Sequence, residues 1–236
     1  MLVKEIKDKL QKLGDKKRAE NLRRYFKTGP GEYGEGDIFI GIPVPELRKL
    51  SRAYHDIPLE TTAKLLKSPI HEERMLALMI LVLKYNRGDA KARKRIYTLY
   101  LKTTQFINNW DLVDLSAHSI VGPFLMDKSK KPLYRLAASK SLWERRIAIM
   151  ATFHYIRQNL YSETLKIAET LISDEEALIH KAVGWMLREI GKRHLHSEEE
   201  FLKPRYKEMP RTMLRYAIEK FPTAKRQHYL NGEIGK

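Results

Sequence analysis

Trp110 and Asp114 are the two residues in this sequence with the clearest potential for chemistry. They are four residues apart in a stretch whose apolar residues have helical spacing, so their side chains share one face of the expected helix. A carboxylate can transfer protons or stabilise a positive charge, and the π face of an indole attracts cations. Trp110 follows two asparagines and precedes Asp111. These polar neighbours favour a functional site over the alternative of a buried core tryptophan.

A second group of candidate residues lies further along the chain. Lys181, Trp185 and Arg188 are four and three residues apart, so they also share one helix face. Arg145 and Arg146 lie in the segment between the two groups. Each of these side chains, taken alone, is more often a core or surface residue. Their related register predicts that two tryptophans, one carboxylate and several cations line one groove.

A repeated pattern accounts for this register. Four segments begin with polar residues and continue with apolar residues at helical spacing, and three of them start with a serine that can cap a helix. A spacing of 36, 35 and 35 residues separates the equivalent positions, which are Met75, Asp111, Arg146 and Lys181. A fixed period in this range is typical of a helical solenoid.

The repeats predict an all-α fold. Further helical stretches at 90–101 and 162–172 alternate with the four segments, and no stretch alternates as a strand would. We expect a right-handed α–α superhelix of HEAT-like repeats with a concave basic groove. A single domain is expected over 1–236, with an N-terminal helical cap and loop at 1–50, repeats at 51–195 and a C-terminal cap at 196–236. Within that last part, we expect a loop at about 196–211 and a helix around 213–221.

The segment Thr28–Pro45 interrupts the helices with glycines and prolines. Gly29, Gly31 and Gly34 match the spacing of a dinucleotide-binding motif, but that motif must follow a strand, and an Arg-rich helical stretch precedes it here. The segment is therefore expected to be a loop that joins the N-terminal cap to the repeats.

The charge balance indicates a polyanionic partner. The chain has 45 Lys and Arg against 29 Asp and Glu, a net charge of +16, which favours a nucleic acid over an unspecific basic surface. Cysteine is absent, which excludes disulfides and thiolate metal sites and fits a cytoplasmic protein. No stretch has the roughly 18 apolar residues of a membrane helix. We expect no metal, no cofactor and no membrane contact, and a monomer.

Three motifs resemble those of one known family, the HEAT-like-repeat DNA alkylation repair proteins of the AlkD-type glycosylases. The resemblance covers nearly the whole chain. It is strongest in NNWDLVD at 108–114, WERRIAI at 143–149 and KAVGWMLREIGK at 181–192, and the loop at 26–50 also resembles many members. The combination of the first and third motifs is the specific signal.

The resemblance implies roles for individual residues. Trp110, Asp114 and Trp185 match the active site of the family, and double-stranded DNA with alkylated purines is the implied partner. Contacts to the DNA backbone are implied for Arg146, Lys181 and Arg188, with Arg145 beside them and a less secure match at Tyr25. The loop at 28–45 is longer and more polar than in the best-known glycosylases.

The expected reaction follows from the chemistry of the lesion. A purine alkylated at N3 or N7 is cationic and leaves as a neutral base, so one carboxylate that stabilises the oxocarbenium-like sugar and positions water is sufficient. No lysine is distinguished as a Schiff-base nucleophile, so a monofunctional glycosylase is expected. The alternatives are a non-catalytic protein that recognises branched or distorted DNA by shape, and a scaffold whose basic groove binds an acidic protein.

Overall fold

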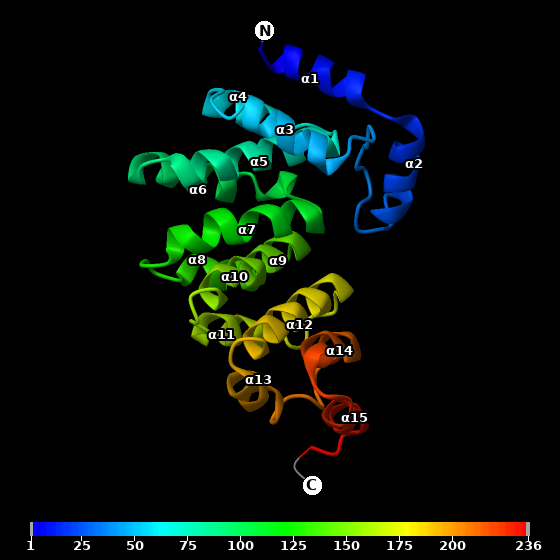
Figure 1. Ribbon diagram of the computed structural model, residues 1–236, viewed down its shortest axis with the longest axis vertical. Helices are drawn as coiled ribbons and strands as arrows, with labels where there is room; N and C mark the ends of the chain where they lie inside the picture. The colour runs from blue at the N-terminus through cyan, green and yellow to red at the C-terminus, as the bar shows by residue number, and fades with distance from the viewer. Residues whose placement is uncertain (1, 235–236) are drawn as a thin grey trace. The chain divides into compact units, whose positions relative to one another are not determined.

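The protein is all-helical in its computed structural model, which describes residues 2–234 (Figure 1). The only β-type pairing in the described residues is an isolated bridge between Ile38 and Ile70. The predicted all-α fold is thus confirmed. No helix of residues 2–234 is both long enough and apolar enough to cross a membrane.

The chain divides into two compact units, 1–116 and 117–236. The first unit contains the following helices and the start of α7, which crosses the division: α1 (Leu2–Leu13), α2 (Lys16–Tyr25), α3 (Val44–Ala53), α4 (Leu59–Leu66), α5 (His71–Arg87), α6 (Ala90–Lys102), the 3₁₀ turn η1 (Thr104–Phe106) and α7 (Trp110–Leu125).

The second unit contains the end of α7 and the remaining helices: α8 (Lys131–Ala137), α9 (Leu142–Ala151), α10 (Phe153–Ile156), α11 (Ser162–Thr170), α12 (Ala177–Gly191), α13 (Leu195–Leu202), α14 (Arg211–Ala217), the 3₁₀ turn η2 (Ile218–Lys220) and α15 (Thr223–Asn231). The stacking of all repeats into one superhelical domain concerns both units together and stays a prediction.

The four repeat segments are helices, as predicted, and they correspond to α5, α7, α9 and α12. The intervening stretches at 90–101 and 162–172 are α6 and α11. The serines that start three of these segments, Ser68, Ser139 and Ser173, were expected as caps, but none of them is an N-cap. The N-caps are Ile70, Ser141 and Glu176, and only Ser141 accepts a hydrogen bond, from Glu144 N. The prediction of a loop over 196–211 was wrong for its first part, because α13 occupies Leu195–Leu202.

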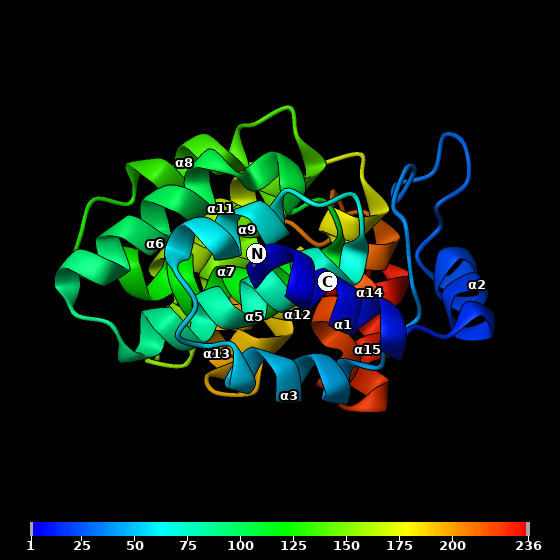
Figure 2. The same cartoon turned by 90° about the horizontal axis from the view of Figure 1, so that it is seen from above.

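Helix α5 forms the centre of the first unit. α3, α4 and α6 all pack against it, and Leu76, Leu78 and Ile80 have no exposed surface. Its first turn is polar yet also buried, which is unusual for charged side chains. Figure 2 shows α2 and the loop after it on the side of this unit away from α6. The buried polar turn of α5 is where this loop attaches.

Helix α12 forms the centre of the second unit, and Gly184 permits its close contact with α14. A Cβ atom at Gly184 would lie 2.4 Å from the carbonyl oxygen of Met213 and 2.5 Å from Cβ of Tyr216 on α14. Gly184, which the packing of α12 on α14 requires, therefore directly precedes the candidate site residue Trp185.

Gly184→Ala is expected to destabilise the protein by about 1–3 kcal/mol, because the added methyl group forces α14 away from α12. Urea unfolding would measure the loss. Gly232→Ala makes no new contact, since nothing lies within 4 Å of its Cβ position, and it serves as a glycine control whose cost comes only from its backbone φ of 78°. Unchanged stability in Gly184→Ala would contradict this account of the packing.

Candidate functional site

Trp110 begins α7 and lies among aromatic rings of the first unit. Its ring stacks on Phe26 with 5.3 Å between centroids and meets Tyr25 edge-on at 6.0 Å. Trp110 is half-buried against the cluster of Ala19, Phe26 and Phe39, whereas Tyr25 is 64% exposed. The structure thus brings Tyr25 and Trp110 together, and one aromatic surface of this group faces solvent.

The indole of Trp110 lies close to the glycine-rich loop. The hydroxyl of Tyr33 lies close enough to the indole of Trp110 for that indole to lower its pKa, and it donates to the backbone oxygen of Tyr25 over 3.4 Å. Burial raises the pKa of Tyr33 more than the indole lowers it, and the charge of Asp111 is among the smaller effects that also raise it. Tyr33 is therefore a neutral hydroxyl that links the end of α2 to the start of α7.

Asp114 is the fifth residue of α7 and lies one turn after Trp110, so the two side chains share a helix face as predicted. It is half-buried. Tyr100 lies close enough to respond to its charge: burial raises the pKa of Tyr100, the hydroxyl of Ser116 lowers it, and Asp114 raises it. Asp114 therefore provides negative charge next to Trp110.

Asp111, three residues before Asp114, is held by a buried histidine. His71 bridges two carboxylates, with Nε2 2.8 Å from Asp111 Oδ2 and Nδ1 3.1 Å from Asp37 Oδ2. The exposed fractions of the side chains are 3% for His71 and Asp37 and 16% for Asp111. The carboxylate of Asp111 is thus bound by the imidazole of His71 on α5.

The charges of this network are mutually dependent. Burial alone lowers the pKa of His71, but the charge and hydrogen bond of Asp111 and the bond to Asp37 outweigh burial and raise the pKa to about 9. Burial alone raises the pKa of Asp37, but the bond from His71 and the charge of Arg74 hold it below its ordinary value. His71 is therefore an imidazolium at neutral pH, and Asp37 is a carboxylate.

Asp37 also gathers groups from α5 and from the turn before α7. Arg74 donates to its Oδ1 over 2.5 Å, and the side-chain amides of Asn108 and Asn109 donate over 3.4 and 3.2 Å. The carbonyl oxygen of Asn109 accepts from Val113 N in the first turn of α7. The two asparagines that precede Trp110 thus attach the start of α7 to the loop.

Trp185 lies in the second unit, on α12. Its ring is half-buried at 6.1 Å from Phe153, and its Nε1 donates to Glu189 over 3.3 Å. Burial alone raises the pKa of Glu189, but bonds from Lys192 and Arg193 hold it below its ordinary value. Since Trp110 and Asp114 belong to the first unit, the predicted meeting of both tryptophans in one groove stays a prediction.

The cations expected to contact DNA differ in their surroundings. Arg145 Nε lies 2.6 Å from Asp174, and Arg188 pairs with Glu219. Arg146 is only 4% exposed and donates to the carbonyl oxygen of Leu178. Lys181, by contrast, is exposed. Three of the four side chains are thus already engaged by the protein.

Helix α2 contributes exposed cations that the sequence analysis did not consider. Arg23 and Arg24 directly precede Tyr25, and both are exposed. Within residues 2–234 neither forms an ion pair, and the same holds for Lys16 and Lys17 at the start of the helix. The aromatic surface of Tyr25 is therefore flanked by unneutralised positive charge.

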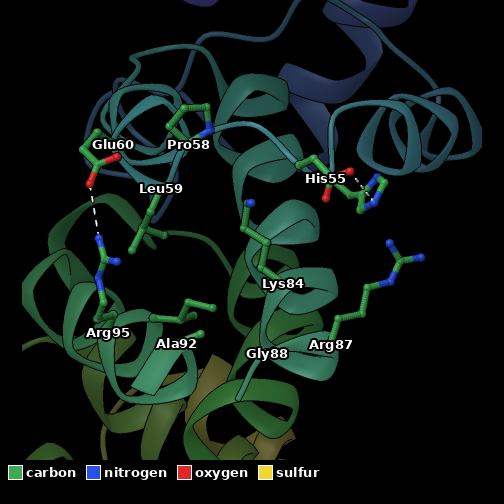
Figure 3. A pocket seen from close by; sticks show the side chains of 11 residues that line it. His55, Pro58, Leu59, Glu60, Lys84, Arg87, Gly88, Ala92 and Arg95 are labelled. Carbon is green, nitrogen blue, oxygen red and sulfur yellow. Dashed lines mark hydrogen bonds and ion pairs between the residues drawn. The ribbon is translucent and has the colours of Figure 1, made fainter. Parts of the chain in front are cut away.

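A separate pocket of about 460 Å³ opens at the other end of α5 (Figure 3). Lys84 and Arg87 reach it from the last turn of α5, where cations offset the helix dipole. Its Glu60 pairs with Arg95 over 3.3 Å. The length of α5, roughly 24 Å for its residues, separates this pocket from His71, so it does not belong to the site around Trp110.

Asp37, His71 and Tyr33 were missed by the sequence analysis. One available signal was the run HEER at 71–74, four charged or titratable residues directly before the apolar run of 75–83 in the same helix. A second was Asp37, an acid directly before the apolar run of 38–44. Neither signal alone shows that the two sets meet, because 34 residues separate Asp37 from His71.

Comparisons with known proteins agree with the helical architecture. A solved structure described as a predicted DNA alkylation repair enzyme from Enterococcus faecalis superposes with a TM-score of 0.67, at 18% identity over 89% of this chain and 97% of that one. AlkD2 from Streptococcus mutans superposes with a TM-score of 0.55, at 18% identity over 88% of this chain and 99% of that one. At this identity the likeness concerns the fold alone. No curated protein sequence matches the chain.

The family model described as "DNA alkylation repair enzyme" matches residues 6–221. That range includes every candidate site residue in both units. Because the match extends over nearly the whole sequence, the chain belongs to the DNA alkylation repair enzyme family.

Proposed function

We propose that this protein is a monofunctional DNA glycosylase that hydrolyses the N-glycosidic bond of purines alkylated at N3 or N7 in duplex DNA. The observation that carries the proposal is the Trp110–Asp114 pair on the first turns of α7, with Trp110 held by aromatic neighbours. A single carboxylate beside an indole suits a reaction that develops positive charge on a sugar.

The proposed reaction balances without a general acid. The bond from C1′ to the base nitrogen breaks, and its electron pair neutralises the cationic purine, which leaves as a neutral base. The deoxyribose then carries oxocarbenium character, which the carboxylate of Asp114 stabilises. Water adds to C1′ and gives up its proton, for which Asp114 is the acceptor.

The tryptophans act on the same charge. The π face of Trp110 favours a nearby cation by about 0.5–2 kcal/mol, and we assign Trp185 of the second unit the same role. Their rings also exclude water from one side of the sugar. Tyr25, exposed beside Trp110, extends this surface toward the DNA.

The phosphates of the duplex are proposed to contact cations of both units. In the second unit these are Lys181, which is exposed, and Arg145 and Arg188, whose carboxylate partners would be exchanged for phosphate. Arg146 is the least suited, since it would have to leave the carbonyl of Leu178. The exposed Arg23 and Arg24 of α2 are additional contacts. We propose that the protein acts as a monomer on DNA in the cytoplasm.

Base release from methylated duplex DNA tests the function directly. Purified protein is incubated with DNA treated with a methylating agent, and free 3-methyladenine and 7-methylguanine are quantified by chromatography. Release of either base above the spontaneous rate is expected. No release, together with tight binding to DNA junctions, would instead support a non-catalytic protein that recognises branched DNA by shape.

Salt dependence provides a second prediction. Binding through 6–10 phosphates should cost about 10³–10⁵ in duplex affinity between about 50 and 200 mM salt, because each neutralised phosphate releases counterions. Fluorescence anisotropy with a labelled duplex would measure this slope. Absence of duplex affinity even at low salt would support a scaffold that binds an acidic protein.

A further inference from the structure

The glycine-rich loop after α2 is attached to the polar first turn of α5. Glu72, 2% exposed, accepts from the backbone nitrogens of Ile40, Gly41 and Ile42 over 3.1, 2.7 and 3.3 Å. The nitrogen of His71 donates to the carbonyl of Ile38 over 2.8 Å. Gly41 has a φ of 87°, a left-handed conformation that glycine adopts without strain. This end of the loop therefore has a defined backbone path.

From this attachment the loop reaches the first two residues of α7 by two routes. Through Tyr33 it binds the backbone oxygen of Tyr25, whose ring meets Trp110 edge-on, and the Tyr33 hydroxyl itself lies close to the indole of Trp110. Through Asp37 it binds His71, whose other nitrogen holds Asp111. Trp110 and Asp111 are thus each approached by a polar side chain, Trp110 by Tyr33 and Asp111 by His71.

Packing supports the second route. The ring of His71 stacks on Phe39 of the loop with 4.4 Å between centroids and lies 5.3 Å from Phe26, and Phe26 in turn stacks on Trp110. The imidazolium is therefore enclosed by carboxylates in its plane and by aromatic rings on its faces. A buried charge of this kind destabilises the fold unless all its partners are in place. The loop, α2, α5 and α7 must therefore keep the relative positions that surround His71.

We propose that residues 28–42 form a positioning latch, in which Tyr33 orients the indole of Trp110 and the bridge from Asp37 through His71 to Asp111 fixes the first turn of α7. In this assignment the loop does not only connect α2 to α3. It also determines the position of the Trp110 ring relative to Asp114, which lies one helical turn later. The consequence for base release rests on the proposed function, whereas the effect on Trp110 itself does not.

A loop that only connected two helices would not need the side chain of Tyr33. The loop's two ends are already held, at Glu72 and through the bond from Gly34 N to the carbonyl of Lys27 over 3.0 Å. Tyr33 adds nothing to those ends. Its hydroxyl instead lies between Trp110 and the backbone of Tyr25, so its removal affects the orientation of these two rings.

Tyr33→Phe tests the latch, because it removes the hydroxyl and keeps the ring. Tyr54→Phe is the matched control, a half-buried tyrosine of the same unit that contacts Lys9 and not the site. The first readout uses a chain in which Trp143 and Trp185 are replaced by phenylalanine, so that Trp110 is the only one of the three tryptophans left. In that chain Tyr33→Phe is expected to red-shift the emission of Trp110 and to raise its quenching by acrylamide, while Tyr54→Phe changes neither.

The second readout keeps all tryptophans and follows base release. Loss of the Tyr33 hydroxyl, and with it the hydrogen bond to the backbone of Tyr25 beside Trp110, is expected to lower the rate at saturating DNA by about 5–10-fold, with duplex affinity changed by less than about twofold. Phenylalanine in place of Tyr54 should leave both quantities unchanged. If the reduced-tryptophan chain does not fold, quenching of total fluorescence in the full chain gives the same comparison between the two variants.

The two readouts separate the latch from the proposed function. Emission and quenching that match the Tyr54→Phe control would overturn the latch, whatever the activity. Altered quenching with an unchanged rate would overturn its role in catalysis and leave only a structural one. If the wild-type protein releases no base, the proposed glycosylase fails, and the fluorescence comparison still decides whether Tyr33 positions Trp110.

Discussion

Replacing Asp114 with asparagine is expected to reduce base release by about 10²–10³-fold, equivalent to about 2.7–4 kcal/mol of transition-state stabilisation. Asparagine has nearly the same shape and can still contact a water molecule. It lacks the negative charge that offsets the oxocarbenium-like sugar, and it cannot accept the proton of the attacking water. The rate of base release from methylated duplex at saturating protein would measure the loss.

Duplex affinity is expected to stay close to that of the wild type, because Asp114 contacts no phosphate in the proposed complex. Asp127→Asn provides the control, since it makes the same chemical change at an exposed residue just after α7. Circular dichroism of each variant would show that the helices are intact. Base release by Asp114→Asn at the wild-type rate would contradict the assigned role of this carboxylate.

The helices around the site could be predicted because their signal is local. Apolar spacing within one segment specifies a helix, and its recurrence about every 35 residues predicted α5, α7, α9 and α12. The alignment of the repeats was less accurate. It placed Asp111 beside Arg146 and Lys181, whereas counting from each helix start makes Asp114 the fifth residue, as Met75, Arg146 and Lys181 are in their helices. The 3₁₀ turn η1 lies directly before α7, so α7 begins later in its repeat than a constant spacing of about 35 residues predicts.

The surroundings of the cations could not be predicted. Arg145 and Asp174 are 29 residues apart, and Arg188 and Glu219 are 31 apart, so only the packing of separate helices shows that each arginine has a carboxylate partner. Net charge counts these arginines together with those of α2, although only the latter lack ion pairs in the described residues. Composition therefore indicated the class of partner correctly for this family without identifying the exposed cations.

The buried network could not be predicted for a different reason. Polar residues at the start of a helix ordinarily face solvent, so the natural interpretation of His71 and Arg74 is a solvated first turn. Their burial depends on a carboxylate that arrives from a loop 34 residues earlier in the sequence. Tyr33 is comparable, because a tyrosine between glycines has no periodicity that would indicate its contact.

Asp37→Ala is expected to destabilise the protein by about 3–5 kcal/mol at neutral pH, because it leaves two buried cations with one carboxylate fewer. His71 would keep only Asp111, and Arg74 would keep only the carbonyl of Ser68 as an acceptor. The amides of Asn108 and Asn109 would lose their acceptor as well. Urea unfolding followed by circular dichroism would measure the change in the free energy of unfolding.

Glu60→Ala is the matched control, since it also removes the carboxylate of an arginine pair in the same unit. Glu60 and Arg95 are 72% and 60% exposed, and such a pair contributes only about 0–1 kcal/mol. The difference between the losses of unfolding free energy in the two variants therefore measures the effect of burying the ion pair. Equal losses below about 1 kcal/mol would show that the network does not hold its elements together.

The loss caused by Asp37→Ala is also expected to depend on pH. His71 has a pKa raised from 6.5 to about 9, so its contribution to stability is complete below about pH 6.5 and is lost as the pH rises through about 9. Asp37 has a lowered pKa, so its contribution is present above its ordinary value of 3.8 and is lost at lower pH. The gap between wild type and Asp37→Ala should therefore be widest between about pH 4 and 6.5 and narrow toward pH 9. It should not close there, because Arg74 remains charged. A gap that widens toward pH 9 would mean that His71 is neutral in the folded protein, and the bridge between the loop and α7 would then lack its charge.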